Sequence, residues 1–217
     1  MTKEEYRAQF NEEDAVGWLA IDKEFERLYP GQEPKHYGTI IKYMIGGEDP
    51  LDGLSIYESN QQMDHFHIVS YGFTNLYYDE EYVGQEFSNW GFELTFRIKK
   101  SHNETAEDQL WAVVIMQQLA KYVFGQNKLL DEYHTLDARG VIRPDYDSAI
   151  TALIFISDPE LGVIDTPHGK VQFLQMFGLT TEEYATIKQG DRESRVVELI
   201  EKIRRENPLF VTDLDRK

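Results

Sequence analysis

Apolar, β-branched and aromatic residues are concentrated in several short stretches of the chain, which predicts strands. These stretches cover residues 36–44, 54–57, 66–73, 92–99, 150–156 and 170–176. The clearest is 92–99, where Phe92, Leu94, Phe96 and Ile98 occupy every second position and therefore share one face of the predicted strand.

Other stretches have apolar residues three or four positions apart, which predicts helices. The first runs over residues 11–28, with Asn11 as its N-cap and Pro30-Gly31 as its stop, and the longest runs over 106–124 with Gly125 as its stop. Thr180 and Glu183 form a capping box that opens another helix, and a last helix covers 193–206. Strands mixed with well-separated helices predict an α+β fold.

The composition describes a chain with a substantial core. Hydrophobic residues make up 41% and aromatic residues 13%, which excludes a disordered acidic tail. No repeat, Pro/Ser-rich linker or low-complexity tract marks a boundary, so we expect a single domain over residues 1–217. The chain has no cysteine, which excludes disulfides, thiolate zinc sites, iron–sulfur clusters and thiol nucleophiles, and is typical of a reducing compartment.

The N-terminus lacks the basic-then-apolar pattern of a signal peptide. The longest nearly apolar run, residues 149–156, is far shorter than the roughly 20 residues that span a bilayer. We therefore expect a soluble, cytoplasmic protein with no membrane partner.

The formal net charge is -17, from 39 acidic and 22 basic residues. The basic clusters do not exceed residues 97–100 and the pair Arg204-Arg205, so the basic footprint of a nucleic-acid-binding protein is missing. Two interpretations of the acidity remain open: it keeps the protein soluble, or part of it receives a basic partner.

His65 and His67 are two positions apart on a predicted strand and would point to the same face. A catalytic zinc site typically needs a third protein ligand, and the remaining histidines have no telling spacing. This pattern favours structural, hydrogen-bonded histidines and predicts no metal. The alternative is a metal-assisted hydrolase or small-molecule-binding protein centred on this pair.

The segment 46–53 contains glycines and acids, but it has no lysine for a phosphate-binding loop and no EF-hand spacing, so it predicts a turn. The chain also has no Gly-x-Ser-x-Gly elbow and no His-Glu-x-x-His helix. Its carboxylates are too numerous to nominate an acid–base pair. We therefore predict no catalytic residues, no cofactor and no enzymatic activity.

Aromatic residues are concentrated between residues 66 and 96, and most of them must pack the core of a sheet. Tyr77, Tyr78 and Tyr82, however, lie among Asp79, Glu80 and Glu81, which indicates contact with solvent. Exposed aromatic residues provide large contact areas for protein partners. Tyr77, Tyr78, Tyr82 and Trp90 are therefore the candidate partner-binding residues.

Five segments in order carry distinctive motifs: 40–52 (IIKYMIGGEDPLD), 65–77 (HFHIVSYGFTNLY), 91–97 (GFELTFR), 119–124 (LAKYVF) and 166–175 (TPHGKVQFLQ). They resemble patterns such as K-Y-x-x-G-G-x-D-P-L-D and G-F-E-L-T-F-R of the Suppressor of fused family, in particular its N-terminal domain. The resemblance covers roughly residues 14–213.

This resemblance implies a mixed, mainly antiparallel sheet flanked by helices, with a non-enzymatic, protein-binding role. In animals the family sequesters Gli transcription factors through a short peptide that adds as a strand between two domains. This chain resembles one of these domains, and short members of bacterial type are associated with immunity proteins that neutralise toxins. The resemblance thus implies a protein or peptide partner, with a basic toxin as one candidate and a general chaperone-like adaptor as another possibility.

Within this resemblance, the tyrosine that contacts peptide in the animal proteins corresponds to Tyr77. The acidic residue of the following family loop has no clear counterpart in residues 87–91, which weakens the prediction of Gli-type recognition. The sequence specifies neither the partner nor the oligomeric state.

Overall fold

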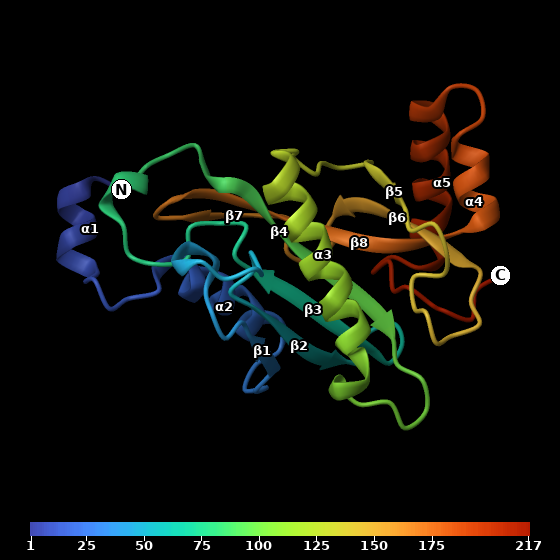
Figure 1. Cartoon of the computed structure of the whole chain (residues 1–217), viewed down its shortest axis with the longest axis horizontal. Helices are drawn as coiled ribbons and strands as arrows, with labels where there is room; N and C mark the ends of the chain where they lie inside the picture. Colours follow the sequence, from blue (N-terminus) through green and yellow to red (C-terminus); the bar gives the residue numbers. More distant parts are fainter.

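The strands of the computed structural model form one mixed sheet (Figure 1). The structure describes residues 1–217 with the exception of the Met44 side chain. Within this part of the chain the sheet has the order β1-β2-β3-β4-β8-β6-β5, and β7 pairs with β8. The strands are β1 (Lys35–Gly38), β2 (Gly53–Ser59), β3 (His65–Tyr71), β4 (Phe87–Lys99), β5 (Thr135–Asp137), β6 (Ile150–Ser157), β7 (Val163–Thr166) and β8 (Gly169–Thr180).

The central pair β4–β8 is parallel and the other pairs are antiparallel. The helices are α1 (Lys3–Gln9), α2 (Val16–Leu28), α3 (Leu110–Gln126), α4 (Thr181–Ile187) and α5 (Arg192–Glu206), with single 3-10 turns η1 (Tyr43–Ile45), η2 (Glu80–Tyr82) and η3 (Ala106–Gln109). This arrangement confirms the predicted α+β class and the mainly antiparallel sheet.

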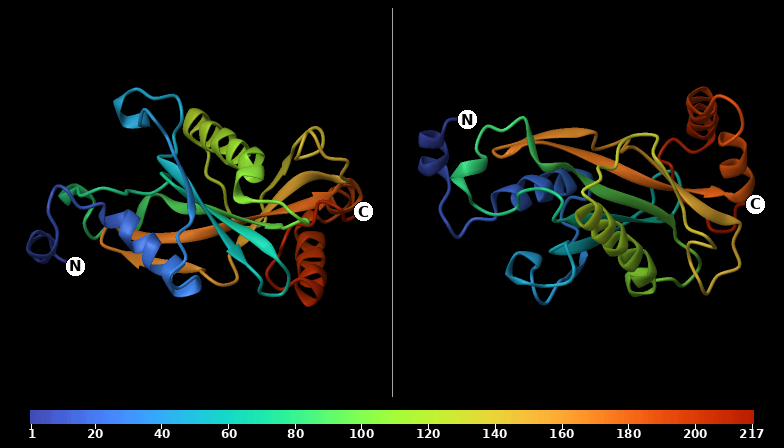
Figure 2. Two further views of the ribbon diagram at one scale, coloured as in Figure 1. Left: turned by 90° about the horizontal axis from the view of Figure 1, so that it is seen from below. Right: turned by 45° about the horizontal axis from the view of Figure 1, so that its top comes forward.

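Helix α3 covers one face of the sheet (Figure 2, left). Its Ala112, Met116 and Ala120 are fully buried in one cluster with Phe92 and Phe96 of β4. At roughly 25 cal/mol per Å² of apolar surface removed from water, contacts of this kind are the main driving force of the fold.

The opposite face is covered by α2 at one end and by α4 and α5 at the other (Figure 2). Phe25 of α2 packs on Tyr57 and Phe173, while Ile200 of α5 packs in a separate cluster with Phe177. The two apolar clusters leave a stretch of buried sheet between them that is occupied by polar side chains.

The first helix differs from the prediction, because it begins at Val16 and not at Asn11. The N–H of Asn11 donates to the Asp14 carboxylate at 2.8 Å, so these residues form a turn ahead of the helix. A separate short helix, α1, precedes them and was not predicted. The strand predicted over 36–44 ends at Gly38, after which the chain leaves the sheet and forms η1.

The predicted strand and helix patterns in the second half are largely confirmed. Helix α3 runs past the predicted stop at Gly125 and ends where Asn127 adopts a left-handed conformation (φ 51°). The capping box of Thr180 and Glu183 opens α4 as predicted. The short edge strands β5 and β7 were missed. None of the helices in the described residues is long and apolar enough to cross a membrane.

Candidate functional site

A pocket of about 240 Å³ lies where the loop after β3 meets the chain segment before β2. Its lining includes Tyr43, Asp52, Tyr77, Tyr78, Tyr82 and Phe124, and we call it the tyrosine pocket. Three of the four candidate partner-binding residues predicted from the sequence therefore line one pocket.

A glycine fixes the backbone at the edge of this pocket. Gly72 follows β3 with φ +141°, and a Cβ atom there would lie 2.8 Å from the Cα of Leu51. The adjacent Asp52 N–H donates to the Tyr71 carbonyl at 2.8 Å. This close approach brings Asp52 against the loop after β3 and so into the pocket.

The buried carboxylate of Glu93 binds the backbone of the loop that follows β3. It accepts hydrogen bonds from the Gly72 N–H (3.1 Å), the Thr74 N–H (3.0 Å), the Thr74 hydroxyl (2.7 Å) and the Ser70 hydroxyl (2.6 Å). Burial raises the pKa of Glu93 to about 7, although these hydrogen bonds act in the opposite direction. Glu93 therefore organises the backbone that leads to Tyr77.

Tyr77 is half-buried and held by two charged partners. Its hydroxyl donates to the Asp52 carboxylate, and the ammonium of Lys42 lies 2.5 Å from the same hydroxyl and 3.9 Å from the centre of the ring. Burial and the bond to Asp52 raise the pKa of Tyr77 well above its usual value. The phenol is thus kept neutral and positioned, which suits a binding role and not a nucleophilic one.

The other two tyrosines continue the aromatic surface toward α1. The Tyr78 hydroxyl donates to Glu80 at 2.8 Å, and this hydrogen bond raises the pKa of Tyr78 to about 12. The Tyr78 ring lies 4.8 Å from the ring of the fully buried Tyr6, which anchors α1 on this loop. Tyr82, 37% exposed, is the most accessible of the three tyrosines.

Trp90 differs from the other predicted residues. It is half-buried and packs behind the pocket, with its ring 5.3 Å from the ring of Phe124. The backbone N–H of Trp90 donates to the Phe73 carbonyl at 3.1 Å. Trp90 therefore supports the pocket wall through Phe124 and does not line the pocket.

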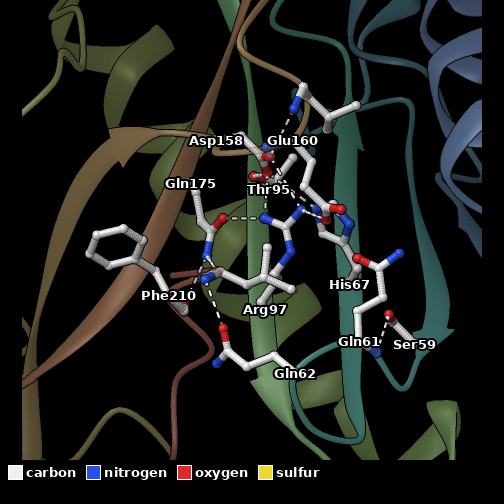
Figure 3. Close-up of polar contacts among 12 residues, drawn as sticks. Ser59, Gln61, Gln62, His67, Thr95, Arg97, Asp158, Glu160, Gln175 and Phe210 are labelled. Atoms are coloured by element: carbon white, nitrogen blue, oxygen red, sulfur yellow. Dashed lines mark hydrogen bonds and ion pairs between the residues drawn. The ribbon is translucent and has the colours of Figure 1, made fainter. Parts of the chain in front are cut away.

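The predicted histidine pair lies elsewhere, on the sheet face between the two apolar clusters, and Figure 3 shows His67 there. Both rings are fully buried, and burial lowers the pKa of each, that of His67 to about 3. His67 Nδ1 shares a hydrogen bond of 2.7 Å with the Tyr29 hydroxyl, and its Nε2 lies 3.3 Å from Asp158. His65 Nδ1 bonds the Met63 carbonyl at 2.8 Å.

The centre of this polar cluster is the buried guanidinium of Arg97. It donates to Asp158 at 2.7 Å and to Glu160 at 2.8 Å, and it also bonds the Gln175 side chain (Figure 3). Burial alone would raise the pKa of the Asp158 carboxyl, but Arg97 and His67 outweigh this effect and hold it well below its usual range. Gln175 in turn donates to the Leu209 and Phe210 carbonyls, so the cluster ties the sheet to the C-terminal segment.

This geometry gives the metal-site alternative no support. The positive charge of Arg97 lies close to His67 and would repel a metal cation there. The Nδ1 atoms of His67 and His65 already form hydrogen bonds with Tyr29 and Met63, respectively. No group of three or more histidine, aspartate or glutamate residues is arranged to hold a metal ion within the described residues. His67 is part of this polar network through Tyr29 and Asp158, whereas His65 bonds only the nearby Met63 carbonyl.

The sequence analysis missed several residues that line the tyrosine pocket or contact its lining. Asp52 and Lys42 fall in the motif 40–52, and Glu93 falls in the motif 91–97, but these motifs indicated only a fold. Tyr6 and Phe124 are contributed by helices far away in the sequence.

The comparisons with known proteins extend over nearly the whole chain. A family model described as "Suppressor of fused protein (SUFU)" matches residues 47–217. The Suppressor of fused homologs of Homo sapiens and Mus musculus are each 35% identical to this chain over 92% of its length. The matches cover 43% of either relative, so the chain spans less than half the length of these curated proteins.

Solved structures have the same fold. A chain of the Sufu–Fu complex crystal structure aligns with a TM-score of 0.81 and 28% identity, covering 94% of this chain and 92% of that one. Drosophila Suppressor of Fused aligns with a TM-score of 0.79 and 28% identity, over 95% of this chain and 52% of that one. A homolog from Neisseria gonorrhoeae, 14% identical, aligns with a TM-score of 0.59 over 93% and 95% of the two chains.

Proposed function

Because this chain belongs to the Suppressor of fused family, we propose that it is a non-enzymatic protein-binding module that sequesters or neutralises a protein partner. A structurally similar chain occurs in a crystal structure of the Sufu–Fu complex, which supports a binding role for this fold. We further propose that residues 1–217 act as one unit in the cytoplasm.

The observation that carries the proposal is the convergence of Tyr77, Tyr78 and Tyr82 on one pocket. Tyrosine rings provide large apolar contact areas with few rotatable bonds, which is why they often dominate the binding energy of interfaces. The pocket also contains the carboxylates of Asp52 and Asp79. A partner side chain with an apolar stem and a basic end, such as arginine, fits this chemistry.

The finer proposal is that the chain is a bacterial-type member of the family that acts as an immunity protein against a basic toxin. The net charge of -17 supports it, because an acidic surface accelerates the encounter with a basic partner. A partner of this kind would place a basic anchor in the tyrosine pocket.

The experiment is a quantitative affinity purification of the tagged chain from its native cells, comparing the wild type with Tyr82→Ala and Tyr77→Ala. We expect one dominant partner, recovered at least about tenfold less well with either variant, since loss of a hot-spot tyrosine costs about 2 kcal/mol or more of binding free energy. Tyr82→Ala is the cleaner variant, because Tyr82 is exposed and its removal leaves the core intact.

The matched control is Tyr122→Ala, which removes an equally exposed tyrosine (41%) outside the pocket lining. Equal recovery by all three variants would remove the tyrosine pocket from the interface. Repeated recovery of no protein partner by the wild type would contradict the binding function itself. A dominant partner that is not a toxin would retain the binding module and reject only the immunity role.

A further inference from the structure

A second groove, of about 710 Å³, lies between β1, the segment that follows it and α3. Its lining includes Gly38, Ile40, Ile41, Glu48, Val113 and Val114, and we call it the β1 groove. It has no lining residue in common with the tyrosine pocket, which lies on the other side of the same segment. Figure 2 (left) shows this segment, drawn in light blue, standing away from the sheet beside α3.

The groove is held open by hydrogen bonds between α3 and the base of the segment. The amide of Gln117 donates to the Leu51 carbonyl at 3.1 Å and to the Thr39 hydroxyl at 3.3 Å, and it accepts from the Leu51 N–H at 3.3 Å. The turn at its tip needs a glycine, because a Cβ on Gly47 would lie 1.9 Å from the Ile41 carbonyl oxygen. The groove is therefore preformed in the free protein.

Large apolar side chains are exposed around the groove. Ile40 is 99% exposed, and Ile41 and Val114 are each 56% exposed. Single exposed apolar residues are common on protein surfaces, but contiguous ones in a chain of net charge -17 indicate an interaction surface.

The outer edge of β1 supplies hydrogen-bonding groups beside the groove. Within the described residues β1 pairs with β2 alone. The Thr39 N–H donates to the Asp52 carbonyl at 2.8 Å, so by the alternation of an antiparallel pair the backbone groups of His36 and Gly38 point away from β2. Such a free edge is a template for another strand.

The local charge is acidic. The charged residues that line the groove are Glu48 and Asp49, and Asp49 is paired with Lys121 at 2.8 Å. The charge of Lys121 also interacts with Glu48, but among the described side chains Glu48 forms no ion pair within 4.0 Å. The nearby Lys35 is neutralised by Glu107 at 2.7 Å, and Lys42 points to the tyrosine pocket.

We propose that the β1 groove is a second docking site, for an extended, basic polypeptide segment that adds as a strand along the free edge of β1. The backbone of this segment bonds His36 and Gly38. An aliphatic side chain enters the space between Ile40 and Val114, and a flanking lysine or arginine pairs with Glu48. The proposal does not depend on the tyrosine pocket.

The test uses a fluorescein-labelled heptapeptide of alternating lysine and valine, titrated into the full chain and followed by anisotropy and by backbone amide shifts. A second peptide of the same sequence is N-methylated at alternate residues, which keeps its charge but removes hydrogen-bond donors. We expect the unmodified peptide to bind and to shift the amides of residues 36–48 and 114, and the methylated peptide to bind at least about tenfold more weakly.

The matched variants are Ile40→Ser with Val114→Ser, and as a control Leu19→Ser with Val197→Ser. Both pairs replace exposed apolar residues and keep the net charge, but Leu19 and Val197 lie on α2 and α5, across the sheet. We expect at least a tenfold loss of affinity for the first pair and none for the second.

Absence of binding at millimolar peptide, equal binding of the methylated peptide, or equal losses in both variant pairs would overturn the proposal. The last two outcomes would indicate general attraction of a basic peptide to an acidic protein. If the two sites are separate, the Tyr82→Ala variant binds the peptide as well as the wild type does. The proposal for the β1 groove and the proposal for the tyrosine pocket can therefore be contradicted independently.

Discussion

The positively charged guanidinium of Arg97 is buried on the sheet and forms ion pairs with Asp158 and Glu160. Removing one member of such a pair leaves the other charge buried and uncompensated, which is far more costly than losing a surface pair. The side chain also connects β4 to the segment that carries Asp158 and, through Gln175, to the C-terminal residues. Arg97 therefore stabilises the fold by joining three segments of the chain through buried polar contacts.

Arg97→Met should lower the free energy of unfolding by about 3–5 kcal/mol, because Asp158 is left without its cation. Urea denaturation followed by circular dichroism measures this change. The control is Lys170→Met, which removes an exposed pair with Asp165 (2.9 Å) and should cost less than about 1 kcal/mol. A loss of less than 1 kcal/mol for Arg97→Met would contradict this account of the network.

At the scale of elements, Glu93 couples β4 to the loop that begins the tyrosine pocket. An unfolded glutamate titrates near 4.5, whereas the pKa of Glu93 in the folded chain is raised to about 7. Between these pH values the folded state binds more protons than the unfolded state. The contribution of Glu93 to the free energy of unfolding is therefore complete below about pH 4.5 and is lost as pH rises through 7.

Glu93→Gln, which keeps the shape of the side chain, should abolish this contribution. Between pH 5 and pH 8 we expect the free energy of unfolding of the wild type to fall, relative to that of the variant, by on the order of 3 kcal/mol at most. Urea unfolding at both pH values measures the difference. The buried histidines titrate in both proteins and cancel in the comparison, and identical pH profiles would contradict the raised pKa of Glu93.

The elements that the sequence predicted well are those whose pattern matches their packing. Alternation in 92–99 correctly placed Phe92, Phe96 and Ile98 on one face, against α3. The opposite face of β4 is also buried, and its Glu93 and Arg97 find their partners on segments distant in sequence. Local pattern cannot reveal such partners. The isolated helix α1 was missed although Thr2 and Glu5 form a capping box, because its single buried residue, Tyr6, leaves no repeating apolar pattern along the helix.

For the candidate site, the sequence predicted tyrosines that contact solvent. The structure has Tyr82 exposed but Tyr77 half-buried between Lys42 and Asp52, which lie 35 and 25 residues away. Trp90 was grouped with them because it is aromatic and close in sequence, yet it packs behind Phe124. Which side of a loop a residue faces is decided by tertiary contacts and not by its neighbours in sequence.

The whole molecule combines an excess of 17 negative charges with the two surfaces that we propose for partners, the tyrosine pocket and the β1 groove. Long-range attraction of this kind accelerates the encounter and is screened by salt. If the partner is basic, its association rate should fall at least about tenfold between 0.05 and 0.5 M NaCl, with a much smaller change in the dissociation rate. Stopped-flow measurement of both rates would test this, and a salt-independent association rate would contradict a basic partner.

The central claim is that the tyrosine pocket is the surface at which this protein binds its partner. Hydrogen–deuterium exchange of the chain, alone and in complex with the partner recovered from its native cells, tests it most directly. We predict slower exchange over residues 72–82 and 50–52 in the complex, with little change over α4 and α5. Protection confined to α4 and α5, or no protection over 72–82, would contradict the claim.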